Sequence, residues 1–232
     1  RAQIQYCETG FNEDGKLTGM RVRLVGDAGA YPSMGALLPG LTKQMANGTY
    51  NFPKVRFDVA VAITNTSPTG AYRGAGRPEA TYLLERTMDY AARQVGMDPA
   101  EFRRINFIPK DAFPYQTAVA LQYDVGDYEA PLDRALEMIN YKGFEKRRSE
   151  AAQRGKYRGI GLSSYIEACG IAPSAVVGAL GGRVGLYESA VVRVDPTGTV
   201  SVFTGAHSHG QGHDTTFAQI VAEKLGIPIG NV

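Results

Sequence analysis

Residues 205–216 read GAHSHGQGHDTT and contain all three histidines of the chain. An alternating apolar run at 200–204 precedes this stretch, and an apolar pattern of helical period follows it to Leu225, so the stretch is predicted to join a strand to a helix. A glycine-rich loop at the start of a helix brings backbone N–H groups together with the positive end of the helix dipole, which suits an anion. Residues 205–216 are therefore the first candidate binding site.

Three interpretations of this loop stay open on the residues alone. His207, His209 and His213 could hold zinc, although the glycines between them give none of the fixed spacing that a helix provides. The loop could also be a solvated turn. In the third interpretation it holds a phosphate or a cofactor, and the amide of Gln211 and the hydroxyls of the two threonines add donors to those of the backbone.

A second glycine-rich loop, AYRGAGRPE at 71–79, lies between a predicted strand and a predicted helix. Its glycines let the backbone approach a ligand closely, and Arg73 and Arg77 add positive charge. The loop is not a Rossmann fingerprint, because the third glycine of that motif is missing and no βαβ unit surrounds it. A solvated surface turn is the alternative.

The spacing of apolar residues predicts an α+β fold, in which hairpins pair the strands and helices lie between them. Turn residues at 14–15 and 195–198 close the two hairpins. The predicted strands are 3–9, 17–27, 54–66, 158–168, 189–194 and 200–204. The predicted helices are 78–95, one that begins at 98–101, 128–141, 142–156 and 215–225, with a short helix within 28–50. The predicted loops are 107–127 and the glycine-rich 170–185. We place the domain boundary within 110–155 and divide the chain into 1–127 and 128–232.

The composition is that of an ordinary globular protein, with 44% hydrophobic and 21% charged residues. A net charge of +2 gives no electrostatic reason to expect nucleic acid or an acidic membrane as partner. We expect no membrane span, because apolar runs of about 18 residues are missing. Cys7 and Cys169 are expected to be reduced, and they cannot hold an iron–sulfur cluster by themselves. No leader is recognisable, which predicts a cytoplasmic protein, and both ends are expected to continue into a longer polypeptide.

Four stretches resemble the molybdenum hydroxylases, the superfamily of xanthine dehydrogenase, aldehyde oxidase and the carbon monoxide dehydrogenase large subunit. GQGHDTTFAQI at 210–220 is similar to the Gly-Gln-Gly-His-(Glu/Asp)-Thr-Thr segment of that family, and AYRGAGR at 71–77 to its Ala-(Tyr/Phe)-Arg-Gly-x-Gly loop. SSYIEACG at 163–170 and FRRINF at 102–107 also fit. The match spans nearly all of the chain in the expected order. It implies parts of two molybdopterin-binding domains, built from mixed sheets with packed helices.

The resemblance implies a molybdopterin cofactor, extended to a cytosine dinucleotide in most bacterial members, and no direct metal ligand from this chain. It assigns cofactor contacts to Gln211, Gly212, His213, Thr215, Thr216, Arg73 and Gly74, and substrate-pocket positions to Ala75 and Tyr165. Purine-oxidising relatives have an aromatic residue where Ala75 stands, so the resemblance implies a pocket of different shape.

The implied reaction is oxidative hydroxylation of a small molecule, in which a water-derived oxygen is added to a C–H carbon. Electrons would leave through iron–sulfur clusters on a small subunit and FAD on a medium subunit, in a dimer of heterotrimers. The catalytic Glu of the family is expected beyond Val232, so no catalytic residue is assigned within this chain. Glu79, Glu85 and Glu167 are predicted to have structural roles.

Gly74 stands where carbon monoxide dehydrogenases have the Cys that binds copper beside molybdenum. Copper(I) needs a soft thiolate ligand, which glycine cannot supply. With this departure, the resemblance predicts a hydroxylase other than a true carbon monoxide dehydrogenase. The alternatives are a non-catalytic binding domain and a zinc hydrolase that uses His207, His209 and His213.

Overall fold

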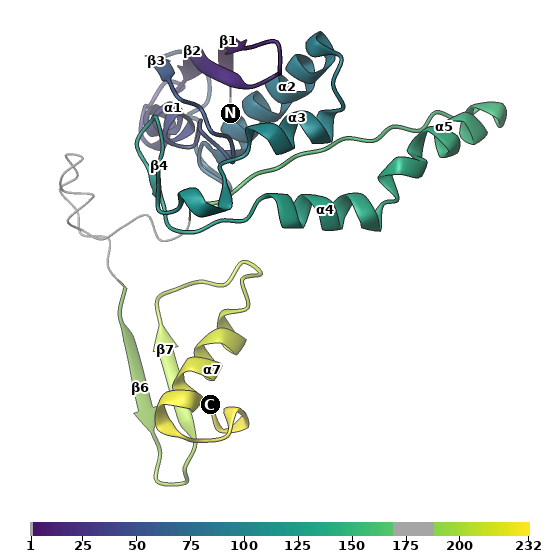
Figure 1. Ribbon diagram of the computed structural model, residues 1–232. Helices are drawn as coiled ribbons and strands as arrows, with labels where there is room; N and C mark the ends of the chain where they lie inside the picture. The colour runs from purple at the N-terminus through teal and green to yellow at the C-terminus, as the bar shows by residue number, and fades with distance from the viewer. Residues whose placement is uncertain (1, 169–187) are drawn as a thin grey trace. The chain divides into compact units, whose positions relative to one another are not determined.

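The computed structural model describes residues 2–168 and 188–232 (Figure 1). The chain divides into two compact units, which we call unit 1 (1–167) and unit 2 (168–232). Cys169 and the glycine-rich stretch 170–185 lie outside the described residues. The domain boundary between residues 127 and 128 stays a prediction.

A three-stranded sheet begins unit 1, in the order β1-β2-β3. Strands β1 (Gln3–Phe11) and β2 (Leu17–Asp27) form the predicted antiparallel hairpin. Strand β3 (Val55–Ala62) pairs with β2 in parallel, a pairing that the predicted hairpins do not include. A parallel pair needs a crossover connection, and the helix α1 (Met34–Gln44) lies within it.

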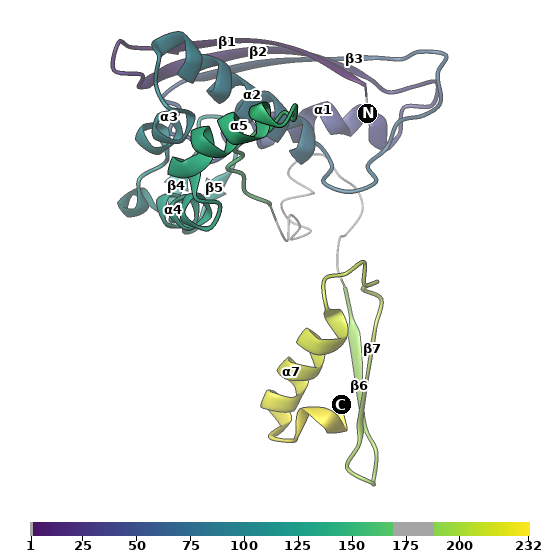
Figure 2. The same ribbon diagram turned by 90° about the vertical axis from the view of Figure 1, so that its right-hand side faces the viewer.

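Helices cover one face of this sheet (Figure 2). Strand β2 turns its alternate residues Met20, Val22 and Leu24 to that face, and all three are buried. The helices α2 (Arg77–Val95) and α3 (Pro99–Asn106) were both predicted, and their apolar residues complete the core. The layer of α1, α2 and α3 on the sheet confirms the α+β class.

The rest of unit 1 consists of short elements and two helices. Their bounds are η1 (Lys110–Ala112), β4 (Tyr115–Gln116), β5 (Gln122–Tyr123), α4 (Glu129–Met138), η2 (Tyr141–Gly143) and α5 (Phe144–Gln153). Helices α4 and α5 confirm the two helices predicted within 128–156. Leu132 of α4 is buried in the core that α2 and the sheet form.

The strand predicted at 158–168 is wrong, because the structure has no strand in this part of the chain. Side chains bind the backbone groups that a neighbouring strand would otherwise pair. The carbonyl of Leu162 accepts from Arg103 at 3.1 Å, and the N–H of Ser164 donates to Glu85 at 2.8 Å. Apolar residues at alternate positions, such as Leu162, therefore reflect an extended segment packed on helices.

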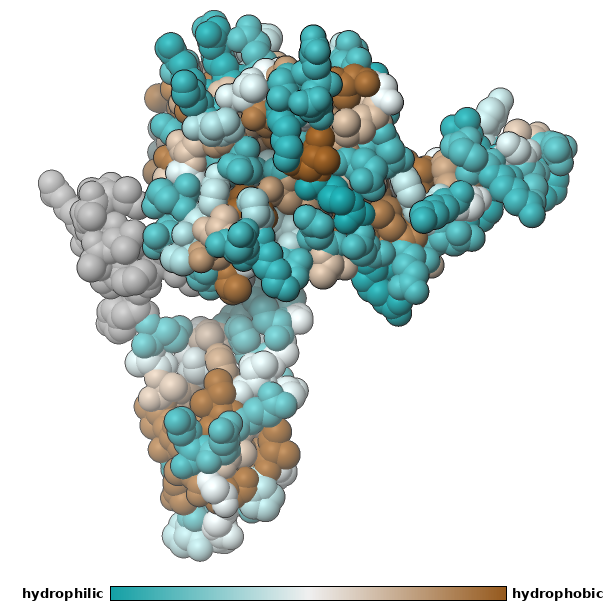
Figure 3. All heavy atoms as spheres, viewed as in Figure 1, coloured by the Kyte–Doolittle hydropathy of each residue, from teal (hydrophilic) through white to brown (hydrophobic). Residues whose placement is uncertain are grey.

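Unit 2 contains the second predicted hairpin and the predicted helix. Strands β6 (Ala190–Val194) and β7 (Val200–Thr204) pair antiparallel. The helix α7 (His213–Leu225) begins two residues before the predicted start, and η3 (Ile229–Asn231) follows it. Much of the surface of this unit is apolar (Figure 3). Among the described residues of both units, no helix is long and apolar enough to cross a membrane.

Candidate cofactor and substrate site

The loop before α2 depends on glycines at two positions. Gly74 and Gly76 have φ values of 81° and 87°, which other residues rarely adopt. A Cβ at Gly76 would lie 2.5 Å from the backbone nitrogen of Thr42 in α1, and one at Gly74 would lie 2.7 Å from Cδ of Pro78. The predicted cofactor loop is thus packed tightly between α1 and the start of α2.

The two arginines of this loop have different environments. The side chain of Arg77 is 10% exposed, and its Nε lies 2.8 Å from Oε1 of Glu167. Arg73 is exposed, and its guanidinium carbon lies 5.9 Å from the ring centroid of Tyr72. The charge of Arg77 is therefore balanced within unit 1, whereas Arg73 is the arginine that the loop presents at its surface.

Asp27, at the end of β2, holds the segment that leads into this loop. Its carboxylate accepts from the N–H of Gly29 at 2.8 Å and from the hydroxyls of Thr64 and Thr66 at 2.7 Å and 3.1 Å. These bonds, first that from Gly29, lower the pKa of Asp27 below its usual value. The hydroxyl of Thr69 also donates to the backbone carbonyl of Asp27 at 2.8 Å. The loop is thus anchored on its N-terminal side by Asp27 and on its C-terminal side by the contact of Gly76 with α1.

A cleft of about 510 Å³ lies between α2 and the segment 162–167. Two predicted site residues, Gly74 and Tyr165, both line it, and Tyr165 is 68% exposed. Arg73 and Ala75 are not among its lining residues. The structure thus brings one residue of the predicted cofactor loop and one predicted substrate-pocket residue to the same cleft.

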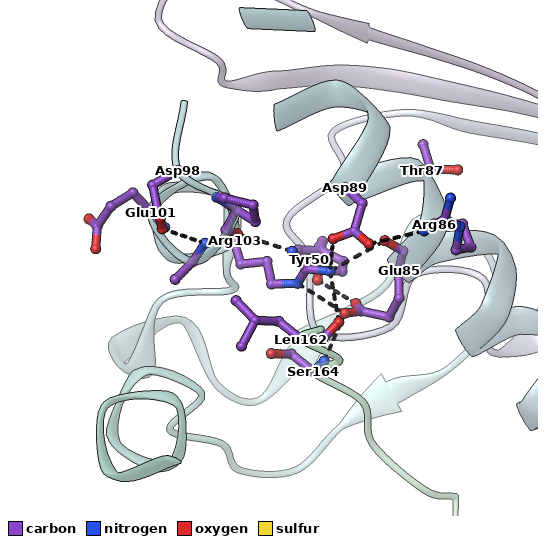
Figure 4. A network of polar contacts seen from close by, with 12 residues as sticks. Tyr50, Glu85, Arg86, Thr87, Asp89, Asp98, Glu101, Arg103, Leu162 and Ser164 are labelled. Carbon is purple, nitrogen blue, oxygen red and sulfur yellow. Dashed lines mark hydrogen bonds and ion pairs between the residues drawn. The ribbon is translucent and has the colours of Figure 1, made fainter. Parts of the chain in front are cut away.

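A network of charged and polar side chains adjoins this cleft (Figure 4), and two of its members, Glu85 and Asp89, also line the cleft. Arg103 of α3 is fully buried, and its guanidinium binds Oε2 of Glu85 at 3.0 Å and Oδ1 of Asp89 at 2.9 Å. The hydroxyl of Tyr50 donates to the other oxygen of Glu85. Burial, together with the charge of Glu85, raises the pKa of Tyr50 well above its usual value, so this hydroxyl stays protonated.

Arg103 keeps its charge in spite of its burial. Burial lowers the pKa of Arg103, but the interactions with Tyr50, Glu85 and Asp89 outweigh that effect and hold the pKa above its usual value. A buried charge is stable only when it is paired and hydrogen-bonded. This network therefore also fixes the position of the backbone groups bonded to it, which are the carbonyl of Leu162 and the N–H of Ser164.

Sequence reasoning did not identify these residues as part of a site. Glu85 was predicted to be structural, and its bonds agree with that. A signal was present, because Glu85 interrupts the apolar face of α2 next to Leu84 and Met88. A charged residue on a buried helix face needs a partner of opposite charge, but the helix pattern does not show that the partner is Arg103.

In unit 2, the loop before α7 has an open shape. Gly210 and Gly212 have φ values of 108° and 74°, and a Cβ at either would meet nothing within 4 Å. Gly212 caps α7 without a side-chain hydrogen bond to the first turn. The carbonyl oxygen of Gln211 accepts from the backbone N–H of His209 at 2.5 Å, which leaves the NH2 group as the donor of that side chain. An anion could approach the start of α7 closely.

The other predicted cofactor residues lie on the first turns of α7. The ring of His213 stacks on Phe217 at 5.0 Å, and its Nδ1 is buried without a hydrogen-bond partner among the described residues. The hydroxyl of Thr216 donates to the carbonyl of Gly212 at 3.1 Å, so it is used within the helix. Thr215 is exposed. Asp214, also in the first turn, adds a negative charge that works against an anion.

The histidines do not form a metal site. The rings of His207 and His209 meet edge to face with centroids 4.6 Å apart, whereas His213 stacks on Phe217. Within 2–168 and 188–232, no group of three or more His, Cys, Asp or Glu is placed to hold a metal ion. The geometry therefore gives the zinc interpretation no support. The open glycines, the helix start, the Gln211 amide and the unpartnered Nδ1 of His213 fit a phosphate-bearing cofactor better.

Comparison with known proteins agrees with this assessment. Models of the molybdopterin cofactor-binding domain match residues 1–107 and 134–232. The carbon monoxide dehydrogenase large chain of Hydrogenophaga pseudoflava is 39% identical over 224 residues, which are 93% of this chain and 27% of that relative. The crystal structure of quinoline 2-oxidoreductase from Pseudomonas putida 86 has a TM-score of 0.89 at 35% identity, over 100% of this chain and 30% of that one. The copper- and molybdenum-containing CO dehydrogenase has a TM-score of 0.86 at 33% identity, with the same coverage.

The chain contains molybdopterin cofactor-binding domain sequence in two stretches and belongs to the molybdenum hydroxylase family, as the resemblance predicted. The relatives it matches are molybdenum-containing oxidoreductases. The chain spans less than a third of the length of these relatives.

Proposed function

We propose that this chain forms part of the molybdenum-cofactor-binding large subunit of an oxidative hydroxylase. The observation that carries the proposal is the open glycine loop at the start of α7, within a stretch that matches a molybdopterin cofactor-binding domain. When bound, the molybdenum cofactor supplies the two-electron oxidation of a C–H carbon, with the added oxygen coming from water. The chain's own residues bind the cofactor and orient the substrate.

Each predicted site residue has a role in this proposal. Backbone N–H groups at Gly212 and the first turn of α7 hold a phosphate, and the NH2 group of Gln211 donates beside them. His213 offers the buried Nδ1 to the cofactor, and Thr215 offers an exposed hydroxyl. Thr216 contributes its backbone position, because its hydroxyl bonds to Gly212.

The loop before α2 serves the substrate side in this proposal. Arg73 and Gly74 would contact the cofactor, Ala75 would leave room in the substrate pocket, and Tyr165 would form part of its wall. Gly74 and Tyr165 line one cleft, which supports this assignment. In this proposal no residue of this chain acts as the general base.

The partners follow from the same proposal. The relatives include chains named as large subunits, and such chains work with other subunits. We propose an iron–sulfur small subunit and an FAD medium subunit as partners in a dimer of heterotrimers, a cytosine dinucleotide form of the cofactor, and a cytoplasmic location. The substrate is a small molecule other than carbon monoxide.

Gly74 is the residue that speaks against carbon monoxide as the substrate. A copper site at this point needs a thiolate, and Cys7 is on β1, where its sulfur lies 3.7 Å from the hydroxyl of Thr87. The backbone at Gly74 also disfavours a side chain, because its φ is positive and the ring of Pro78 occupies the space. The cleft of this chain is thus not shaped for a copper ligand at position 74.

Elemental analysis of the intact complex, purified from its native host, tests the proposal. We expect about one molybdenum per large subunit, with neither copper nor zinc in comparable amount. Molybdenum with equivalent copper would return carbon monoxide to the list of substrates. Folded protein without molybdenum would overturn the proposal and favour a non-catalytic binding domain. Zinc lost in His207→Ala would favour the zinc hydrolase.

A further inference from the structure

The segment 162–167 is held in place through its backbone rather than through strand pairing. The N–H of Ser164 donates to Oε2 of Glu85 at 2.8 Å, and the carbonyl of Leu162 accepts from Arg103 at 3.1 Å. The carbonyl of Ser164 also accepts from the hydroxyl of Thr49 at 3.4 Å. Two of these bonds involve buried ionised groups, and such bonds are stronger than those between neutral groups.

These bonds fix one wall of the cleft. Tyr165 and Ile166, which follow directly after Ser164, line the cleft on one side, and Pro78 and Tyr82 of α2 line it on the other. The anchoring residues cannot move easily, because Arg103 is fully buried and Glu85 is 6% exposed. The position of the wall relative to α2 is therefore set by the buried pair.

We propose that Glu85 and Arg103 are positioning residues that set the width of the substrate cleft by holding the backbone at Leu162 and Ser164. That the cleft binds the substrate rests on the proposed function. That Glu85 and Arg103 hold the wall rests on hydrogen bonds within unit 1 alone. Neither residue takes part in the chemistry.

Two substitutions at Glu85 distinguish the effect of side-chain length from the effect of side-chain charge. Glu85→Asp keeps the charge, but its shorter carboxylate cannot bind Arg103, Tyr50 and Ser164 together. Glu85→Gln loses the charge but keeps the reach: its carbonyl oxygen can accept from Arg103 and Ser164, and its NH2 can donate to Tyr50, whose hydroxyl can also accept. We expect Glu85→Asp to release the wall and Glu85→Gln to retain it.

Asp89→Asn is the matched control. It removes the other carboxylate from Arg103, at 2.9 Å, and Asp89, which also lines the cleft, takes no part in the bonds that hold Leu162 and Ser164. If the network only balanced the buried charge of Arg103, then Glu85→Gln and Asp89→Asn would both release the wall and Glu85→Asp would have little effect. That order is the reverse of the one we expect.

The experiment uses the complete complex with its partner subunits. Ile166→Cys, a half-buried position, is introduced into each variant, and its reaction with N-ethylmaleimide is followed by peptide mass spectrometry. In Glu85→Asp we expect labelling to be at least about tenfold faster, since a lost bond to a charged group shifts an opening equilibrium by that order. Labelling in Glu85→Gln and Asp89→Asn should stay within about twofold of the parent. Molybdenum content should be the same in all.

Kinetics on a compound that the parent complex oxidises tests whether the cleft binds the substrate. Quinoline, which the name of the relative from Pseudomonas putida 86 gives as its substrate, is the first probe, with a dye as electron acceptor. We expect KM to rise about tenfold in Glu85→Asp with kcat within about twofold, because the wall does not react and binds the substrate equally in the ground state and the transition state. Unchanged labelling overturns the inference. Faster labelling with unchanged KM shows that the cleft is not the substrate site.

The experiment gives a result even if Glu85→Asp does not fold or if the complex is inactive. If Glu85→Asp does not fold, Ser164→Pro removes the same N–H donor and leaves Glu85, Arg103 and Tyr50 intact, and it carries the same expectation. If no compound is oxidised and molybdenum is absent, the proposed function has failed. The labelling result then still decides whether the buried pair holds the wall.

Discussion

Gly76 and Gly96 lie at the two ends of α2 and share a positive φ, of 87° and 69°. They differ in their surroundings. A Cβ at Gly76 would overlap the backbone of α1, whereas one at Gly96 would meet nothing within 4 Å. Gly96→Ala should therefore cost about 1 kcal/mol, the strain of the left-handed conformation. Gly76→Ala should cost at least about 3 kcal/mol, because the loop must also move away from α1. Urea unfolding of the purified large subunit measures both, and equal losses would show that the contact with α1 is unimportant.

Asp27 gives the chain a pH dependence at the residue scale. Its folded-state pKa is lowered, so the ionised carboxylate contributes stability above the ordinary pKa of about 3.9, and this is lost as the pH falls through the folded value. Asp27→Asn should lower the melting temperature near neutral pH and should flatten its decline in acid. Asp58→Asn, an exposed position on β3, is the control. Curves of Asp27→Asn and parent that run parallel from about pH 3 to about pH 7 would contradict this.

Single residues also show what the sequence could and could not predict about the site. The glycines and arginines of 71–77 and the GQGHDTT stretch were identifiable because their residue types are unusual at those spacings. The anchoring role of Asp27 was not, because its partners Thr64 and Thr66 are distant in sequence and ordinary in composition. Which residues contact the cofactor stays a prediction.

At the scale of elements, α3 was predicted from its first residues. The side chain of Asp98 accepts from the N–H groups of Ala100 and Glu101 at 2.8 Å and 3.2 Å, and Pro99 occupies the first turn. Asp98→Ala should cost about 1–2 kcal/mol in the unfolding of the purified large subunit. Asp98→Asn, which keeps the cap, should cost less than half of that. A loss of similar size in both would point instead to the charge of Asp98 at the helix start or to its other carboxylate oxygen, which accepts from the hydroxyl of Tyr141 at 3.0 Å.

Elements that depend on distant partners were predicted less well. The hairpins followed from local turn residues, but the parallel pairing of β3 with β2 across α1 had no local signal. The segment 158–168 alternates like a strand, yet its backbone bonds go to Glu85, Arg103 and Thr49. Alternation shows that a segment is extended and half-buried, and it does not show what pairs with it.

At the scale of the whole molecule, unit 2 leaves much apolar surface uncovered. Val191, Phe203 and Ile220 are 64%, 58% and 58% exposed. Apolar patches of this kind bind other surfaces or cause aggregation. The chain of residues 1–232, expressed alone, should therefore form soluble aggregates or bind a hydrophobic dye, as gel filtration and fluorescence would show. A monomer with a sharp, reversible thermal transition would contradict this, and the complete complex is the control.

In the loop that ends at Gly76, the residues that hold the loop in the fold are different from the residues at its tip. One end is fixed by Asp27 and by Gly29, whose Cβ would meet Ser67 at 2.4 Å, and the other by the contact of Gly76 with α1. Both anchors, and the strained position Gly74, lie outside the tip at 70–73. The tip can therefore accept new residues while the fold that carries it is unchanged. A scaffold with this property is evolvable, and laboratory selection for altered substrates would best begin with libraries confined to the tip.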